Sequence, residues 1–176
     1  MVNPLRTVAI LIPFALTLSA QVPSTRLVYV SVTDPLGRFV TGLDKDHFTI
    51  VENDVQRQIT GFSDVDSSIA IAIVSDVPLQ AAPDLLIQAR SVSDALQQLA
   101  SSKSIRKALI STGAAITQST PAGIQVVQAK PDDLDKVLRE IRNEYLLTFD
   151  SAETGANIAV VMNPPRGLPP LRATSK

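Results

Sequence analysis

The chain has 176 residues, of which 45% are hydrophobic and 19% are charged, and its formal net charge at pH 7 is −1. This composition is typical of a globular protein, because disordered chains combine low hydrophobicity with high net charge. The balanced charge argues against nucleic acid as a partner, since no basic excess is present to neutralise phosphates. The sequence has no cysteine, which excludes disulfides, thiolate nucleophiles and zinc–thiolate sites.

The first twenty residues have the pattern of a secretory signal peptide. Arg6 supplies a positive charge, an apolar run follows over residues 7–18, and the small residues Ser19 and Ala20 precede the expected cleavage position. The apolar run is shorter than the ~20 residues that span a bilayer. We therefore expect residues 1–20 to be cleaved from a protein that is secreted or held in the periplasm or cell envelope, without stable membrane insertion. A retained N-terminal anchor is the alternative.

The remainder of the chain divides into two parts of different composition. Acidic residues exceed basic ones over 27–66 but not over 67–176, and most of the aromatic residues lie in the first part. The hydrophobic pattern also changes after residue 66, from alternation to longer apolar runs and helical spacing. We therefore expect a small β-module over residues 26–66 and an α/β domain over residues 67–176.

Residues 27–33 form the first predicted strand of the β-module. Valine occupies every second position from 28 to 32, which indicates a strand with one buried face. The sequence Asp34-Pro35-Leu36-Gly37 then predicts a turn, because proline presets φ and glycine accepts a positive φ. We expect a return strand to start at Phe39.

A short helical turn and a hairpin complete the β-module. Residues 43–47 predict a polar connection with one helical turn. The stretches 48–52 and 55–59 predict two strands around Asn53-Asp54, and both of these residues tolerate the left-handed conformation of a tight hairpin. Residues 61–63 close the module.

The second module begins with an apolar stretch at residues 69–74. Such an uninterrupted run is typical of a central parallel strand that helices cover on both faces. Pro83 then predicts the start of a helix over residues 83–101, because apolar residues recur there at helical spacing. These residues are Leu85, Ala89, Val92, Leu96 and Leu99.

The rest of the second module alternates between strands and one further helix. Strands are predicted at 107–111, 123–127, 144–149 and 158–162, and a helix at 132–142, where two aspartates lie at the positive end of the helix dipole. The proline pairs at 164–165 and 169–170 are expected to end regular structure. This order of elements is typical of an α/β fold with right-handed crossovers.

Few residues suggest catalysis or metal binding. His47 lies beside Asp44 and Asp46, but a single histidine without further ligands favours an ordinary surface position. The aspartates at 132, 133 and 135 are explained by the start of a helix, and no calcium-loop spacing follows them. The chain also has no phosphate-binding glycine motif and no G-x-S-x-G turn. We therefore predict no catalytic residues and no cofactor.

Asp76 is the best-placed polar residue of the sequence. It follows the predicted central strand almost directly, and ligands of open α/β sheets bind outside the carboxyl ends of the strands. A ligand-binding role and a helix-capping role both fit this position, and capping is the simpler of the two.

Several stretches of the chain carry longer motifs. Residues 30–53 follow the pattern V-x-D-x-x-G-x-x-V-x-G-L-x-x-x-D-F-x-x-x-E-x-G, with His47 inserted and Asn53-Asp54 in place of the glycine turn, and residues 58–63 continue the match. Residues 138–149 and 164–173 follow the patterns L-R-x-x-Y-x-L-x-Y and P-R-G-L-x-x-R-A. In these motifs the chain resembles the secreted von Willebrand factor A-related proteins of acidobacterial type. The resemblance implies a β-module followed by a Rossmann-like von Willebrand A domain.

The metal site that such A domains carry is incomplete in this chain. The D-x-S-x-S motif of the family corresponds to residues 76–80, where Asp76 is kept but Pro78 and Gln80 replace the two serines. Thr112 stands where a second acid is expected, and the short span before Lys107 lacks the loop that supplies a threonine. The resemblance therefore implies a reduced A-like domain with a degenerate metal site, of which Asp76 is the remnant.

Together these features predict a secreted, non-catalytic protein-interaction module, similar to adhesion domains but independent of metal. The expected partner is another protein, and its binding residues are not identified by the sequence. Two alternatives remain open: a secreted hydrolase that uses the acidic residues, and a degenerate domain fragment without a specific activity.

Overall fold

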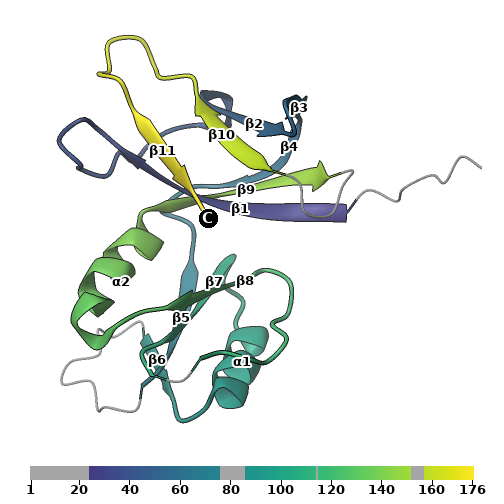
Figure 1. Cartoon of the computed structure of the whole chain (residues 1–176), viewed down its shortest axis with the longest axis vertical. Helices are drawn as coiled ribbons and strands as arrows, with labels where there is room; N and C mark the ends of the chain where they lie inside the picture. The colour runs from purple at the N-terminus through teal and green to yellow at the C-terminus, as the bar shows by residue number, and fades with distance from the viewer. Residues whose placement is uncertain (1–23, 76–85, 114, 152–156) are drawn as a thin grey trace, which may run out of the picture.

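The protein forms two units that lie one above the other (Figure 1). The computed structural model describes residues 24–75, 86–113, 115–151 and 157–176. Within these residues the chain is mixed α/β, with two antiparallel sheets, one parallel sheet and two α-helices. We call the part that contains both antiparallel sheets the β unit, and the part that contains the parallel sheet the α/β unit. The α/β fold class predicted from the sequence is confirmed at this level.

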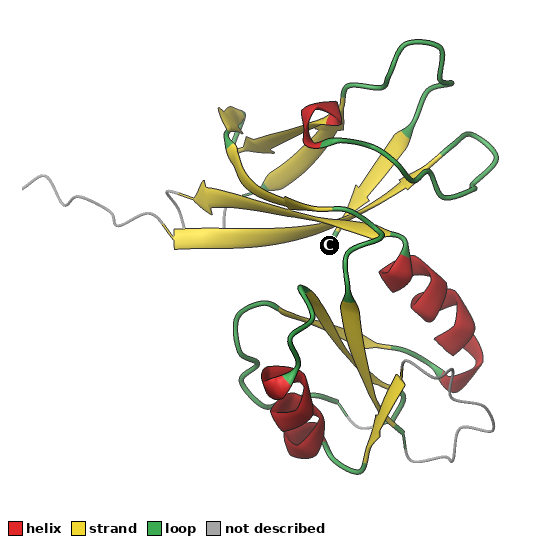
Figure 2. Ribbon diagram, turned by 180° about the vertical axis from the view of Figure 1, so that it is seen from behind, coloured by secondary structure: helices red, strands yellow, loops and turns green. Residues whose placement is uncertain are grey.

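The β unit consists of two antiparallel sheets (Figure 2). The larger sheet has the strand order β11-β1-β9-β4, and the smaller one has the order β10-β2-β3. The strands of the larger sheet are β1 (Ser24–Thr33), β4 (Ile59–Ser63), β9 (Glu144–Ser151) and β11 (Arg172–Ser175). Those of the smaller sheet are β2 (Phe48–Glu52), β3 (Val55–Arg57) and β10 (Ile158–Met162).

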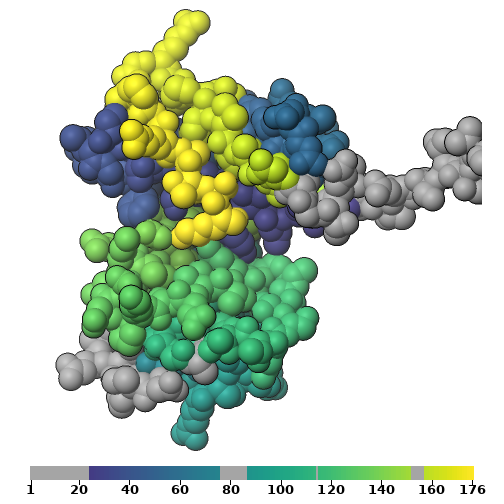
Figure 3. Space-filling model, in the orientation of Figure 1, coloured from purple at the N-terminus to yellow at the C-terminus, as the bar shows by residue number. Residues whose placement is uncertain are grey.

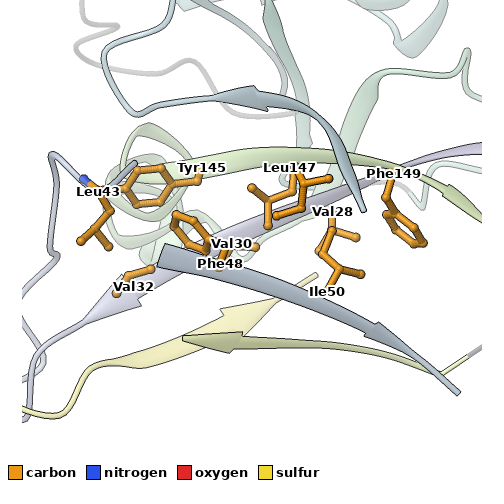
Figure 4. Close-up of a cluster of buried hydrophobic side chains, with 10 residues drawn as sticks. Val28, Val30, Val32, Leu43, Phe48, Ile50, Tyr145, Leu147 and Phe149 are labelled. Carbon is orange, nitrogen blue, oxygen red and sulfur yellow. The ribbon is translucent and has the colours of Figure 1, made fainter. Parts of the chain in front are cut away.

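The core of the β unit lies between its two sheets. The alternating valines of β1 point into it, as the sequence predicts, together with Phe48 and Ile50 of β2 and Leu147 and Phe149 of β9 (Figure 4). Tyr145 also enters this core, and its ring lies 5.0 Å from that of Phe48 between centroids. The Tyr145 hydroxyl donates to the carbonyl of Val40 at 3.0 Å, so the one polar atom of this ring is paired.

The turns of the β unit follow the sequence closely. Asn53 and Asp54 have φ values of 48° and 65°, the left-handed conformation of a type I′ hairpin, and they join β2 to β3. Gly37 has a φ of 76° in the predicted turn after β1. The predicted helical turn is present as a 3₁₀ turn, η1 (Lys45–His47). The expected return strand at Phe39 is reduced to a single bridge with Thr33.

The α/β unit is built on a parallel sheet with the strand order β6-β5-β7-β8. Its strands are β5 (Ile69–Val74), β6 (Leu86–Ala89), β7 (Arg106–Ser111) and β8 (Ile124–Gln128). The helices are α1 (Val92–Ser101) and α2 (Leu134–Arg142), the latter preceded by a 3₁₀ turn, η2 (Pro131–Asp133).

The two helices cover opposite faces of the parallel sheet. Ile71 and Ile73 of β5 pack with Leu138 of α2, whereas Ala72 of β5 packs with Ala95 and Leu99 of α1. The prediction that residues 69–74 form a central strand buried on both faces is therefore confirmed. The small side chains on the α1 side let that helix lie close to the sheet.

The predicted helix over residues 83–101 is wrong in its first half. Residues 86–89 form β6, which pairs in parallel with residues 71–74 of β5, and the helix begins only at Val92. Ser91 is the N-cap, because its hydroxyl accepts a hydrogen bond from the backbone N–H of Asp94 at 3.1 Å. Four residues can satisfy a helical stripe and a short buried strand equally, and pairing with β5 decides between the two here. Pro83 lies outside the described residues.

The two units do not follow the predicted boundary between residues 66 and 67. Strands β9, β10 and β11, which the sequence assigns to the second domain, pair with β1 and β2 in the β unit. Because β4 and β9 are neighbours, with Ser63 opposite Leu146, the α/β unit is inserted between two paired strands. The prediction that the proline pairs end regular structure is wrong for Pro169 and Pro170, because β11 follows them and pairs with β1. Local patterns show that a strand exists but not which strand it pairs with.

Within the described residues, no helix is both long and apolar enough to span a membrane.

Candidate functional site

A cleft of ≈ 320 Å³ lies between the β unit and helix α2. Its floor is the outer face of the larger antiparallel sheet, and the turn after β1 forms one wall. The cleft is lined by Ser31, Thr33, Gly37, Phe39, Thr174 and Lys176 of the β unit and by Lys136, Arg139 and Glu140 of α2. Figure 3 shows the C-terminal residues, in yellow, on this part of the surface at the boundary between the units. The cleft is therefore formed by segments from both units.

Strand alternation explains why polar side chains form the floor of the cleft. Val30 and Val32 of β1 point into the core of the β unit, so Ser31 and Thr33 point to the opposite face. In the sheet, Ser31 is opposite Thr174 of β11 on one side and Glu144 of β9 on the other. Neighbouring strands thus bring hydroxyl and carboxylate groups together below α2.

Helix periodicity explains which residues of α2 face the cleft. Leu134, Leu138 and Ile141 are buried against the parallel sheet. Lys136 and Arg139 are exposed on another side of the helix, three residues apart and therefore neighbours on its surface. The amphipathic pattern of α2 thus places two cations over the polar floor.

The hydroxyl of Ser31 is the unusual group of this cleft. Ser31 is only 8% exposed, and among the described residues its Oγ has no hydrogen-bond partner. A buried polar group without a partner costs about 1–3 kcal/mol. The Oγ atom itself is buried, so this hydroxyl lies beneath the surface of the cleft.

Lys176 connects the cleft to a buried carboxylate. Its Nζ lies 2.9 Å from Oε2 of Glu140 and 3.0 Å from Oε1 of Glu144. Burial by itself lowers the pKa of Lys176, but the hydrogen bonds to Glu140 and Glu144 more than offset this effect, so the pKa is raised above its ordinary value. Lys176 therefore carries its charge at neutral pH and compensates the acids beside the cleft.

Arg106 holds together the two connections between the units. Its guanidinium donates to the carbonyls of Val65 and Ser67 at 2.8 and 3.3 Å, on the connection from β4 to β5. It also donates to the carbonyls of Ile141, in the last turn of α2, and of Glu144, the first residue of β9. Arg106 is only 2% exposed, and this burial lowers its pKa, while the charge of Glu144 acts in the opposite direction.

The side chain of Glu144 completes this junction. Its Oε2 accepts a hydrogen bond from Nε2 of Gln125 at 2.9 Å, while its Oε1 faces Lys176. The hydroxyl of Tyr29 also donates across the junction, to the carbonyl of Gly123 at 3.4 Å. The units are therefore connected by side chains as well as by chain segments, which favours a cleft whose two walls keep their relative position.

Asp76, the site residue predicted from the sequence, lies outside the described residues, together with Pro78 and Gln80. At the carboxyl ends of β5 and β7, Oγ1 of Thr112 donates to Oγ of Ser75 at 2.9 Å. The strand order places the connections of β5 and β7 on opposite sides of this point, which is where open α/β sheets bind ligands.

The other candidate residues have structural roles. The Nδ1 of His47 accepts a hydrogen bond from the backbone N–H of Asp44 at 3.0 Å, so this histidine closes the local turn η1. Asp132 and Asp133 are exposed in η2, just before α2. In the part of the chain that the structure describes, no three His, Cys, Asp or Glu residues are grouped as metal ligands.

The cleft was not predicted from the sequence. The alternation along β1 was a usable signal, because buried valines at even positions place Tyr29, Ser31 and Thr33 on the opposite face. What the sequence did not show is that this face meets α2, since that depends on the pairing of β1 with β9.

Comparisons with known proteins give little further information. No protein-family model and no curated protein matches the chain. Among solved structures, an aminopeptidase from Aneurinibacillus sp. strain AM-1 is similar at 9% identity and a TM-score of 0.26, over 79% of this chain. The chain spans 36% of the length of that protein.

Proposed function

We propose that the chain is an exported, non-catalytic protein-binding module whose binding surface is the cleft between the β unit and α2. The observation that carries this proposal is the cleft itself, which Lys136 and Arg139 line without forming an ion pair among the described residues. A concave surface with polar groups that the fold leaves uncompensated is typical of a binding site.

Two further features support a binding role. The cleft is formed by both units, and Arg106 fixes the two chain connections between them, so the surface needs little rearrangement to bind. Preorganised surfaces lose less conformational entropy on binding. The resemblance to secreted von Willebrand factor A-related proteins also favours a protein partner, and we propose that residues 67–142 are a reduced form of that domain in which binding does not need a metal.

Filling the cleft tests this proposal. Thr174 is exposed on β11 and lines the cleft, so Thr174→Trp should obstruct it without disturbing the core. The matched control is Gln56→Trp, an exposed polar residue on β3, in the other sheet. Proteins of the envelope and extracellular fractions would be captured on each immobilised variant and quantified by mass spectrometry.

We expect Thr174→Trp to lose at least about nine-tenths of the specifically captured partner, which corresponds to a tenfold weaker affinity. Gln56→Trp should capture as much as the wild type, and chelator should change neither result. Equal capture by both variants would overturn the assignment of the cleft. A partner that is released as a cleaved product would favour the hydrolase alternative instead.

A further inference from the structure

We propose that the cleft recognises an acidic peptide segment, with a Glu or Asp side chain of the partner inserted between α2 and the floor of the sheet. This inference rests on the proposed function and specifies the partner at the same site. Lys136, Arg139 and Lys176 line the cleft, and the two acids beside it, Glu140 and Glu144, both pair with Lys176. The positive charge of Lys136 and Arg139 makes the cleft complementary to a negatively charged ligand.

The cations differ in how far their charge is already compensated. Lys176 forms ion pairs with Glu140 and with the buried Glu144. Lys136 and Arg139 form no ion pair among the described residues, and their side chains are exposed on the α2 side of the cleft. These two residues therefore leave positive charge at the entrance that a carboxylate would neutralise.

The floor carries hydroxyl groups that can orient a carboxylate. Thr33 and Thr174 line the cleft, and their hydroxyls can donate to an oxygen of the ligand. Hydrogen bonds in which one partner is ionised are about twice as strong as those between neutral groups. A carboxylate whose oxygens face the floor would accept from these hydroxyls while its charge lies near Lys136 and Arg139.

The size and apolar part of the cleft favour a peptide over a larger rigid surface. A volume of ≈ 320 Å³ is at the small end of ligand-binding cavities, which are roughly 300–1,000 Å³. Phe39 is half-buried on the wall and offers an apolar contact next to the polar floor. The expected ligand is therefore a short extended segment in which an acidic residue lies beside an apolar one.

Two synthetic peptides test this chemistry. One alternates Glu and Leu, and the other carries Gln in place of every Glu, so that the shape is kept and the charge removed. Binding of each fluorescently labelled peptide to the full chain would be measured by anisotropy at low and high salt. We expect the Glu peptide to bind at least about tenfold more tightly than the Gln peptide. Its affinity should fall at high salt, because salt screens the exposed cations.

Variants connect the binding to individual residues. Lys136→Gln combined with Arg139→Gln should weaken binding of the Glu peptide by about tenfold or more. The matched control is Lys130→Gln combined with Arg166→Gln, which removes the same charge from two exposed residues that do not line the cleft. This control should change affinity by less than about twofold, because exposed distant charges are largely screened.

Thr174→Val removes a hydroxyl and keeps the branched shape, so it tests the floor of the cleft. It should also weaken binding of the Glu peptide by about tenfold, since the hydroxyl hydrogen bonds to an ionised group. It should leave the melting temperature unchanged, because Thr174 is exposed on the edge strand β11. Free glutamate at the same concentration should not displace the peptide.

Equal affinity for the Glu and Gln peptides, or no binding of either peptide, would overturn the inference, as would displacement by free glutamate. Its failure is distinguishable from that of the proposed function. If Thr174→Trp abolishes partner capture while the double variant at Lys136 and Arg139 captures normally, the cleft binds a partner of different chemistry.

Discussion

The two units of the protein are built in opposite ways from the same chain. The β unit combines residues before 64 with residues after 143, and its core contains the aromatic rings of Phe48, Phe62 and Tyr145. The α/β unit is formed by one continuous segment, and the buried residues of its core are aliphatic, with several alanines. The comparison shows that a folded unit of this protein can be built from two distant segments of the chain as well as from one continuous segment.

The junction between the units differs from both cores. It contains the buried polar groups of Arg106, Glu144 and Gln125, beside the buried side chains of Tyr29 and Leu146 on the outer face of the larger sheet. Polar contacts of this kind depend strongly on geometry, because a buried charge without its partner is costly. The predictions below test whether the units are independent in their cores and coupled at this junction.

The largest expected effect comes from removing the inserted unit. Ser63 of β4 lies opposite Leu146 of β9, so a short Asn-Gly turn could replace residues 65–143 and close a hairpin between these strands. We expect the remaining chain to fold as an all-β protein with one cooperative thermal transition. Circular dichroism and calorimetry would measure this. A product without cooperative unfolding would show that the β unit depends on its insertion.

Arg106→Leu should have the next largest effect. The substitution leaves the carbonyls of Val65, Ile141 and Glu144 without this donor, and each unpaired buried group costs about 1–3 kcal/mol. We therefore expect a loss of about 3–5 kcal/mol in the free energy of unfolding. Urea denaturation would measure it. Lys103→Leu, at an exposed position just before β7, is the control and should change stability by less than about 0.5 kcal/mol. A loss below about 1 kcal/mol at Arg106 would contradict the proposed coupling.

Ala95→Leu tests the close packing of α1 within the α/β unit. Ala95 is fully buried against β5, so the larger side chain should cost about 1–3 kcal/mol through overpacking. Ala100→Leu on the exposed side of the same helix is the matched control and should be nearly neutral. Both values follow from chemical denaturation. Equal effects of the two substitutions would mean that α1 does not pack as closely as described.

Asp34→Asn should have the smallest effect, limited to the turn after β1. The backbone N–H of Arg38 and, to a smaller extent, its guanidinium lower the pKa of Asp34 below 3.8, against the opposing effect of desolvation. A lowered pKa in the folded state means that the carboxylate stabilises the protein above pH 3.8, and this contribution is lost as the pH falls through the folded-state value.

The melting temperatures of wild type and Asp34→Asn should therefore differ at neutral pH and converge below pH 3.8. Asp46→Asn, at an exposed position in η1, serves as the control. A difference that persists unchanged to pH 2 would show that the turn does not depend on the charge of Asp34.

Local patterns were sufficient for most elements of the fold. The alternating valines of β1, the apolar run of β5 and the amphipathic stripe of α2 each determine an element by themselves, because burial of one or both faces follows from the pattern. Two strands were missed for a physical reason. Leu86–Ala89 is too short to distinguish a strand from a helix, and β11 is a polar edge strand that carries no alternating apolar signal.

The pairing of distant segments was beyond these patterns. Strand β9 was predicted at its correct place, but its pairing with β1 and β4 was not predicted. Its membership in the β unit could therefore not be inferred. The candidate cleft depends on the same pairing, because the pairing of β1 with β9, the strand that follows α2, brings β1 and β11 close to that helix. The residue that the sequence did single out, Asp76, is outside the described part of the chain.

The insertion of the α/β unit also sets an order of events during synthesis. Val30 of β1 pairs with Tyr145 of β9, so the central pair of the larger sheet joins residues that lie far apart in the sequence and are synthesised at different times. The inserted unit is complete once α2 has been made, and its contacts are closer in sequence, which favours faster folding. Until β9, β10 and β11 have been synthesised, the edges of β1 to β4 remain unpaired, and exposed edges promote aggregation. The C-terminal strands therefore complete both sheets of the β unit. Loss of these strands would leave unpaired strand edges beside a folded insertion.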